Sequence, residues 1–289
     1  MNIRVLGAHS RETATTKYTS LLVDDVLALD AGSLASSLSI PAQKRLKAIL
    51  VTHEHYDHVR DIPAIALNMF RECSSIQVCA TPEVLIAIET HLLNGSIYPP
   101  FQDMPQERPS IRFTPVAPYE PVEICGYEVM PVPVNHSAHA VGYQVTDARG
   151  KAVFFYTGDT GPLSAECWQH LSPQLLVTET TFPARRASVA IRTRHLTPSG
   201  LHHSLIAFRQ LKAYLPEVAV VHMDPAMETE TAQEIAGVAG DLGASITMAH
   251  ANMLLPVPEP AVPAAGMCRQ GGPAASYTER ETAAPACTG

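Results

Sequence analysis

Three histidines and an aspartate follow one another closely where an apolar, strand-like run ends. The run covers residues 47–52, and the polar residues behind it are His53, His55, Asp57 and His58. Imidazole nitrogens and carboxylate oxygens are costly to leave unpaired, and they are the ligands that zinc and similar ions prefer. In an extended stretch, side chains two residues apart share a face, so His53 and His55 can bind one ion together. The run therefore predicts a metal site rather than a chance surface cluster of histidines.

Short apolar and β-branched runs recur along the chain and are bounded by Gly, Pro, Asp or Asn. These strand-like runs cover residues 2–7, 19–24, 26–30, 47–52, 76–80, 111–115, 127–134, 142–146, 152–157, 175–179, 218–222 and 245–249. Helical patterns cover residues 59–70, 82–93, 198–215 and 228–242. Strands that come first as a meander and later alternate with helices predict an α/β fold, in which two sheets stack inside outer helices.

The composition of the chain changes near residue 254. From residue 256 onward the chain is rich in Pro, Ala and Gly, shows no hydrophobic periodicity and contains few large apolar residues. Such a segment cannot bury enough apolar surface to offset the entropy lost on ordering it. We therefore expect one domain over residues 1–254 and a disordered tail over residues 255–289.

The composition also argues against several classes of protein. No apolar run approaches the ~18 residues of a membrane span. The first residues lack the organisation of a signal peptide, and the six cysteines contain no CxxC pair. We expect a cytoplasmic protein without a membrane partner. Its oligomeric state stays open, a homodimer included.

The net charge of −8 bears on nucleic-acid partners. A long RNA would need a compensating basic stripe, and none is present. The strongest basic group is short and consists of Arg185, Arg186, Arg192 and Arg194. It suits either one or two phosphates or a solvated loop, so we expect no large nucleic acid as a partner.

The run from His53 to His58 resembles the signature of the metallo-β-lactamase superfamily, and the other motifs of that family occur in the family's order. They are the strand-end aspartate Asp30, the histidines His136 and His222, and the aspartate Asp159. The resemblance spans residues 1 to about 250 of this chain. It implies an α/β fold of the four-layer αβ/βα sandwich type, the metallo-β-lactamase fold.

The same resemblance implies two divalent metal ions. His53, His55 and His136 would bind one ion, Asp57, His58 and His222 would bind the other, and Asp159 would lie between them. Asp30 would orient the site from behind the ligands. A ligand set rich in histidine favours zinc, with manganese and iron as alternatives.

Glu179 and His195 resemble a catalytic pair of ribonuclease Z and of the class II cyclic-nucleotide phosphodiesterases. In those enzymes the histidine protonates the leaving group and the glutamate holds the histidine. The resemblance implies that a metal-bridging hydroxide attacks phosphorus, oriented by Asp57 or Asp159, and that His195 protonates the departing alkoxide. Taken alone, either member of the pair could be a cap or a helix-start residue.

Loop lengths separate these two enzyme groups. Ribonuclease Z has a long tRNA-binding arm between its third and fourth metal motifs, but the segment from His136 to Asp159 has room only for two strands and a turn. Residues 91–101 resemble instead the Asn…Trp/Tyr-Pro segment of the class II phosphodiesterases. Asp224 stands where those enzymes have a lysine, and the loss of that cation weakens the case for a cyclic nucleotide as the substrate.

We therefore predict a metal-dependent phosphodiesterase that acts on a small, cyclic-nucleotide-like phosphodiester. Three alternatives stay open: a ribonuclease Z-type RNA endonuclease, a glyoxalase II-like thioester hydrolase and a non-catalytic metal-binding module. The thioester hydrolase shares the ligands but has no need for Glu179 and His195. β-Lactamases of the superfamily generally have a cysteine in place of Asp159, and the flavin-linked diiron oxidoreductases have a carboxylate in place of His55. Antibiotic hydrolysis and redox chemistry are therefore disfavoured.

Overall fold

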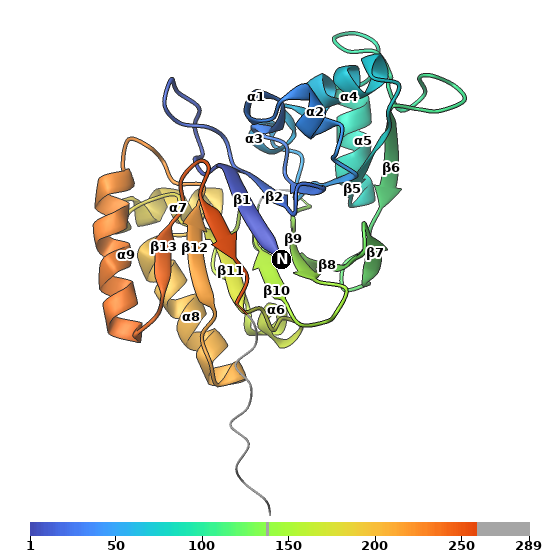
Figure 1. The fold of residues 1–289 in the computed structure, drawn as a ribbon. Helices are drawn as coiled ribbons and strands as arrows, with labels where there is room; N and C mark the ends of the chain where they lie inside the picture. Colours follow the sequence, from blue (N-terminus) through green and yellow to red (C-terminus); the bar gives the residue numbers. More distant parts are fainter. Residues whose placement is uncertain (137–138, 259–289) are drawn as a thin grey trace, which may run out of the picture.

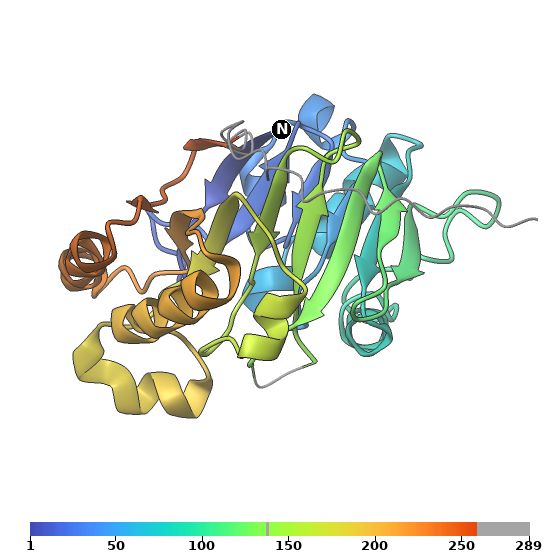
Figure 2. The same cartoon turned by 90° about the horizontal axis from the view of Figure 1, so that it is seen from below.

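The computed structural model describes residues 1–136 and 139–258. Over these residues, two seven-stranded sheets stack on each other, and helices cover the outer faces of both (Figure 1). Figure 2 shows the same layers from below. The predicted α/β four-layer sandwich is confirmed.

The strand order of the first sheet is β14-β1-β2-β3-β4-β5-β6. Its strands are β1 (Asn2–Gly7), β2 (Ser20–Val23), β3 (Leu27–Leu29), β4 (Ala48–Leu50), β5 (Ile76–Ala80), β6 (Ile111–Pro115) and β14 (Leu254–Pro256). The order of the second sheet is β13-β12-β11-β10-β9-β8-β7. Its strands are β7 (Val122–Ile124), β8 (Tyr127–Pro133), β9 (Val141–Thr146), β10 (Val153–Tyr156), β11 (Leu175–Glu179), β12 (Glu217–Val221) and β13 (Ile246–Met248).

The helices divide between the two outer layers. Those that follow strands of the first sheet are α1 (Leu34–Ser37), α2 (Ile40–Gln43), α3 (Tyr56–Val59), α4 (Ile62–Arg71) and α5 (Pro82–His91). Those that follow strands of the second are α6 (Ala165–Gln169), the 3-10 turn η1 (Ala184–Arg186), α7 (Ala187–Thr193), α8 (Pro198–Lys212) and α9 (Glu228–Leu242). Among the described residues, no helix combines the length and the apolarity needed to cross a bilayer.

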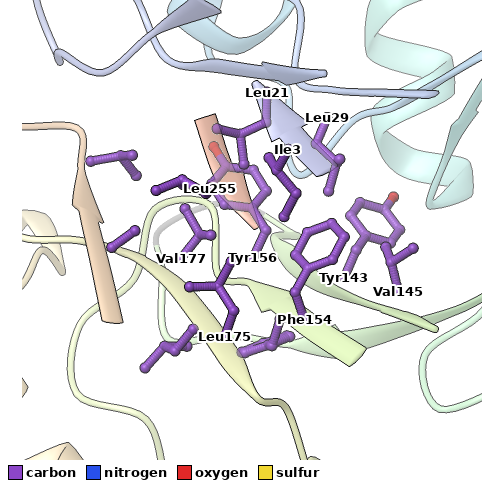
Figure 3. Close-up of a cluster of buried hydrophobic side chains, with 14 of the residues drawn as sticks. Ile3, Leu21, Leu29, Tyr143, Val145, Phe154, Tyr156, Leu175, Val177 and Leu255 are labelled. Carbon is purple, nitrogen blue, oxygen red and sulfur yellow. The ribbon is translucent and has the colours of Figure 1, made fainter. Parts of the chain in front are cut away.

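Side chains from the facing surfaces of the two sheets form the main core. Ile3 and Leu29 of the first sheet lie in one buried cluster with Phe154 and Leu175 of the second (Figure 3). A second buried cluster lies between the first sheet and its covering helices and includes Ile65 of α4. Burial of apolar side chains therefore stabilises the packing of both sheets. The polar residues predicted as ligands lie at the edge of the sandwich instead.

Strand β4 shows how the sequence pattern sets these layers. Ala48 and Leu50 belong to the core between the sheets, whereas Ile49 belongs to the cluster under the helices. Successive side chains of a strand point to opposite faces, so an uninterrupted apolar run serves both clusters. The run ends at Thr52, and His53 emerges at the edge of the sandwich.

The strands that lead into the polar edge run in the same direction. β3, β4, β5 and β6 pair in parallel in the first sheet, and β10, β11, β12 and β13 do so in the second. The loops that follow parallel strands leave a sheet at one edge. The segments after β4, β10 and β12 therefore meet where the two sheets meet.

The predicted helix over residues 59–70 is divided into two helices. α3 begins at Tyr56 and already contains Asp57 and His58, and α4 begins at Ile62 with Pro63 in its first turn. Proline is favoured in a first turn because it lacks the N–H that has no partner there. Because of the break between α3 and α4, Asp57 and His58 lie in a short helix that is separate from α4.

The predicted domain boundary after residue 254 falls inside β14. Leu254 and Leu255 pair with the strand β1, and both Leu255 and Val257 are buried. The domain therefore continues at least to Val257. A three-residue edge strand beside a Pro-rich segment carries too little periodicity to be predicted. Residues 259–289 of the predicted tail lie outside the described residues.

Candidate metal centre

The turn after β4 and helix α3 carry four of the predicted ligands. His53 is fully buried, His55 is the extended N-cap residue of α3, and Asp57 and His58 lie in the helix. Gly32 allows this turn to approach β3, because an added Cβ would lie 2.1 Å from the carbonyl oxygen of Asp57. The turn after β4 and helix α3 thus place these four side chains close together.

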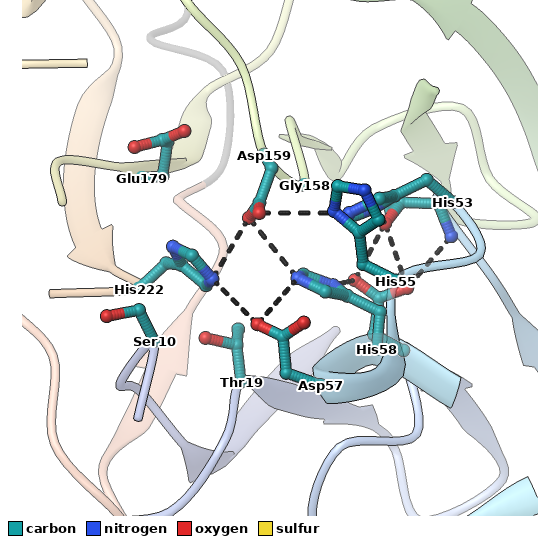
Figure 4. A network of polar contacts seen from close by, with 12 residues as sticks. Ser10, Thr19, His53, His55, Asp57, His58, Gly158, Asp159, Glu179 and His222 are labelled. Atoms are coloured by element: carbon teal, nitrogen blue, oxygen red, sulfur yellow. Dashed lines mark hydrogen bonds and ion pairs between the residues drawn. The ribbon is translucent and has the colours of Figure 1, made fainter. Parts of the chain in front are cut away.

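The two carboxylate oxygens of Asp159 face two different groups of histidines. Oδ2 lies 3.7 Å from His53 Nε2 and 3.9 Å from His136 Nε2. Oδ1 lies 3.3 Å from His58 Nε2 and 3.3 Å from His222 Nε2 (Figure 4). A carboxylate placed in this way can contact two ions at once.

His55 and Asp57 complete the two groups. His55 Nδ1 lies 3.3 Å from His136 Nε2, and Asp57 Oδ2 lies 3.2 Å from His222 Nε2. Within each group the ligand atoms lie within 4.8 Å of one another. The structure thus brings together all the predicted ligands, in the two predicted groups with Asp159 in both. That they bind metal stays a prediction.

The chemistry of these atoms fits divalent metal ions. His53 Nε2, His58 Nε2 and Asp159 Oδ1 are buried and have no hydrogen-bond partner among the described residues, which is costly unless another group binds there. Burial lowers the pKa of His53 well below its ordinary value, which favours the neutral ring that a metal needs. Burial raises the pKa of Asp159, but His222 and His58 outweigh it and hold that pKa well below its ordinary value.

Asp30 holds His58 from behind. Its Oδ2 accepts hydrogen bonds from His58 Nδ1 at 2.7 Å and from the Tyr156 hydroxyl at 2.8 Å, and its Oδ1 accepts one from the backbone N–H of Thr52 at 2.8 Å. Asp30 is fully buried and has a φ of 56°, a left-handed conformation that aspartate adopts more readily than most residues. The hydrogen bond to Nδ1 leaves Nε2 of His58 facing Asp159.

Two other ligand histidines are held by contacts that the sequence did not indicate. Thr181 Oγ1 lies 2.9 Å from His222 Nδ1, and the carbonyl oxygen of Arg194 accepts a hydrogen bond from His136 Nδ1 at 3.2 Å. The Arg194 guanidinium also donates to the carbonyl oxygen of His136 at 2.6 Å. Threonine hydroxyls and backbone carbonyls occur throughout any sequence, so no motif could have indicated these contacts.

Glu179 and His195 form a hydrogen-bonded pair beside the ligands. His195 Nδ1 donates to Glu179 Oε1 at 2.7 Å, and the buried carboxylate also accepts from the backbone N–H groups of Thr160 and Leu196. Burial lowers the pKa of His195, but the Glu179 carboxylate outweighs it and raises that pKa to about 9. The His195 ring is stacked with the ring of His222, with their centroids 5.5 Å apart. An imidazole with a raised pKa thus lies next to the candidate metal ligands.

Asp224 forms an ion pair with an arginine from a distant part of the chain. Arg11 Nη2 lies 2.5 Å from Asp224 Oδ1, and the backbone N–H of Ser10 donates to the carbonyl oxygen of Met223 at 3.0 Å. The sequence analysis predicted the loss of a cation at this point. The segment between β1 and β2 brings Arg11 to Asp224, and the ion pair neutralises that carboxylate without placing a free positive charge beside the candidate ligands, so the prediction still stands.

The other histidines and the short basic group lie outside the two ligand groups. His139 lines a separate cavity of about 720 Å³, and His9 Nε2 lies 3.2 Å from Glu228. Arg185 is paired with Glu230 at 2.8 Å, which fits the solvated-loop interpretation for that residue, whereas Arg194 of the same basic group contacts His136. None of these residues adds a ligand to the centre.

A family match tests the predicted resemblance. Residues 19–223 match the family described as the beta-lactamase superfamily domain. The chain belongs to this superfamily. The matched segment contains every candidate ligand and both members of the Glu179 and His195 pair, so the predicted family is confirmed.

Solved structures of other proteins share the fold at low sequence identity. Unliganded yeast PDE1 has a TM-score of 0.74 at 16% identity, and the match covers 88% of this chain and 98% of that chain. The short form of human tRNase Z has a TM-score of 0.65 at 15% identity, covering 89% and 100%. A diphosphatase from the PhnP family has a TM-score of 0.62 at 16% identity, covering 89% and 98%. No curated protein matches the chain in sequence.

Proposed function

We propose that this member of the superfamily is a phosphodiesterase with two metal ions, and that it hydrolyses a small phosphodiester of cyclic-nucleotide-like size. The pair of Glu179 and His195 beside the shared ligand Asp159 carries the proposal. An alkoxide is a poor leaving group and needs a proton as its bond to phosphorus breaks, and a protonated imidazole supplies one. The fold shared with yeast PDE1 supports the same chemistry.

The residues around Asp159 would hold the two ions, and we propose zinc because the set is rich in histidine. When bound, such ions lower the pKa of a water and neutralise charge on the phosphoryl oxygens. Asp57, which lies at the mouth of the second group, would orient the attacking water. Glu179 holds His195 through Nδ1, which leaves Nε2 to donate a proton to the leaving oxygen.

The reaction balances with these groups alone. Water adds its OH to phosphorus, and the electron pair of the broken P–O bond stays on the alcohol oxygen. That oxygen takes the proton from His195, and the second proton of water restores the imidazole. A linear diester gives a phosphomonoester and an alcohol, and a cyclic diester gives one molecule that carries both groups.

The surroundings of the site support a small substrate. Between His136 and Asp159 the described residues form only β9 and β10, so no arm is inserted there for tRNA. The net charge of −8 also disfavours a long polyanion. The four cysteines of the described residues are free thiols, which supports our proposal that the protein acts in the cytoplasm.

A substrate panel tests this proposal. We expect protein loaded with zinc to hydrolyse bis-p-nitrophenyl phosphate and 3′,5′-cyclic AMP, and to leave precursor tRNA and S-lactoylglutathione unchanged. Asp159→Ala is the control, because activity that survives this change does not come from the centre. Cleavage of precursor tRNA alone would replace the proposal with an RNA endonuclease. Cleavage of the thioester alone would replace it with a thioester hydrolase.

A further inference from the structure

A cavity of about 400 Å³ shares the side chain of His195 with the candidate site. Its walls come from the loop after β10, from α7 and from the start of α8. The apolar part of the lining consists of Pro162, Ala187, Ala190, Ile191 and Leu196. The proposed reaction gives this cavity no role.

The position of His195 connects the cavity to the chemistry. The His195 ring lies 5.1 Å from the ring of His136 and 5.5 Å from the ring of His222, measured between centroids. The same ring forms part of the cavity wall. An oxygen that takes the proton of His195 therefore lies at the boundary between the ligand groups and the cavity. The rest of the leaving alcohol has to extend from that oxygen, and the cavity is the space that adjoins it.

Three polar side chains of the cavity lining form hydrogen bonds within the protein. Thr197 Oγ1 accepts a hydrogen bond from the backbone N–H of Gly200 at 3.2 Å, and Asn135 Nδ2 donates to the carbonyl oxygen of Pro162 at 3.5 Å. The Arg194 guanidinium donates to the carbonyl of His136. Among the described residues that line the cavity, none carries a carboxylate and His195 alone carries an aromatic ring.

Aliphatic carbon makes up much of this lining. Among its described residues, His195 carries the one aromatic ring, and Asn135, Arg194 and Thr197 are the other polar side chains. Ile191 lines the cavity yet is 77% exposed, so it stands at the mouth, where an apolar ligand would cover it.

We infer that this cavity receives the leaving alcohol of the substrate and that the part of the alcohol that enters it is an apolar alkyl or aryl group. The inference rests on the proposed function and narrows it, because it assigns the two sides of the diester. Phosphorus and its remaining ester group lie over the ligand groups. The apolar alcohol departs into the cavity formed by Pro162, Ala187 and Ile191.

Two matched diesters test the inference. Methyl 4-propylphenyl phosphate and methyl 4-(2-hydroxyethyl)phenyl phosphate have isosteric leaving phenols of similar acidity, so they differ mainly in the polarity of what enters the cavity. We expect kcat/KM of the wild type to favour the propyl compound by about 10–100-fold. Ala187→Phe, which fills the cavity, and Ile191→Asp, which makes its mouth polar, should bring the ratio close to one.

The control is Ser188→Ala, an exposed position of the same helix that does not line the cavity. It should keep the wild-type ratio. Because a ratio of two substrates is measured on one preparation, partial unfolding of a variant does not change it. Hydrolysis of both diesters with a wild-type ratio near one overturns the inference while the proposed function stands. If the wild type favours the propyl diester but Ala187→Phe has the same ratio of kcat/KM, the inference is also overturned and the proposed function stands.

A binding measurement separates this inference from a failure of the proposed function. Ligand-observed NMR with 4-propylphenol needs no turnover. Binding to the wild type and to Ser188→Ala, with loss in Ala187→Phe, supports an apolar cavity even if no diester is hydrolysed, in which case the proposed function has failed. Absence of binding to the wild type overturns the inference.

Discussion

At the scale of single residues, the charge of His195 depends on one neighbour. Burial lowers its pKa, and the Glu179 carboxylate at 2.7 Å raises it to about 9. The imidazole is therefore protonated at neutral pH in the arrangement that the structure shows. A proton donor of this kind helps in proportion to how much the leaving group needs a proton.

The leaving group should decide how much His195→Ala costs. A ribose alkoxide departs poorly without a proton, so we expect a loss of about 10²–10⁴-fold in kcat on 3′,5′-cyclic AMP. On bis-p-nitrophenyl phosphate the loss should be much smaller, because p-nitrophenolate departs without help. Equal losses on both substrates, with metal content retained, would mean that His195 positions the phosphoryl group and that another residue donates the proton.

The same pair should make stability depend on pH in the metal-free protein. The pKa of His195 in the folded state, about 9, lies above the ordinary 6.5. The pair therefore stabilises the fold fully below the ordinary pKa, and this stabilisation is lost as the pH rises through the folded-state value. We expect His195→Gln to lower the free energy of unfolding by roughly 3 kcal/mol near about pH 6, and by much less near about pH 10. Urea unfolding of both proteins measures this, and a loss that grows with pH contradicts the assignment.

At the scale of elements, the sequence predicted those strands that have a clear hydrophobic pattern. The apolar run that ends at His53 predicts both β4 and the ligand turn, and period-two burial in Ala48, Ile49 and Leu50 explains why. Short elements such as α7 and β14 were not predicted, because a few residues give no measurable period. Arg11 was missed because its contact with Asp224 depends on the packing of a distant loop.

Strand β14 provides a test of where the domain ends. A chain that stops after Met253 loses the pairing of β1 with β14 and the burial of Leu255 and Val257. We expect that truncation to lower the free energy of unfolding by about 2–5 kcal/mol. A chain that stops after Pro258 keeps those contacts and should stay within about 0.5 kcal/mol of the full chain. Urea unfolding of both truncated chains measures this difference in stability. Equal stabilities would place the domain boundary before β14.

At the scale of the whole molecule, the site connects the two sheets. The first sheet supplies ligands through the turn after β4 and helix α3, and the second supplies them through the segments after β8, β10 and β12. The sequence could predict which residue types gather there, because the family pattern preserves their order. The resemblance also implied that Asp159 lies between two ions. Which oxygen of Asp159 faces which group depends on how one sheet is stacked on the other, and the sequence alone does not give it. This geometry supports the two-ion site that the resemblance implied.

Metal content per chain tests that proposal most directly. After loading with zinc and removal of the excess, elemental analysis should give about two ions per wild-type chain. Asp159→Ala should hold fewer, because one change removes a ligand from both groups, and it should be inactive. His195→Ala is the matched control and should keep the wild-type content. A wild-type content of one or none, or full occupancy with near-normal activity in Asp159→Ala, would contradict the account.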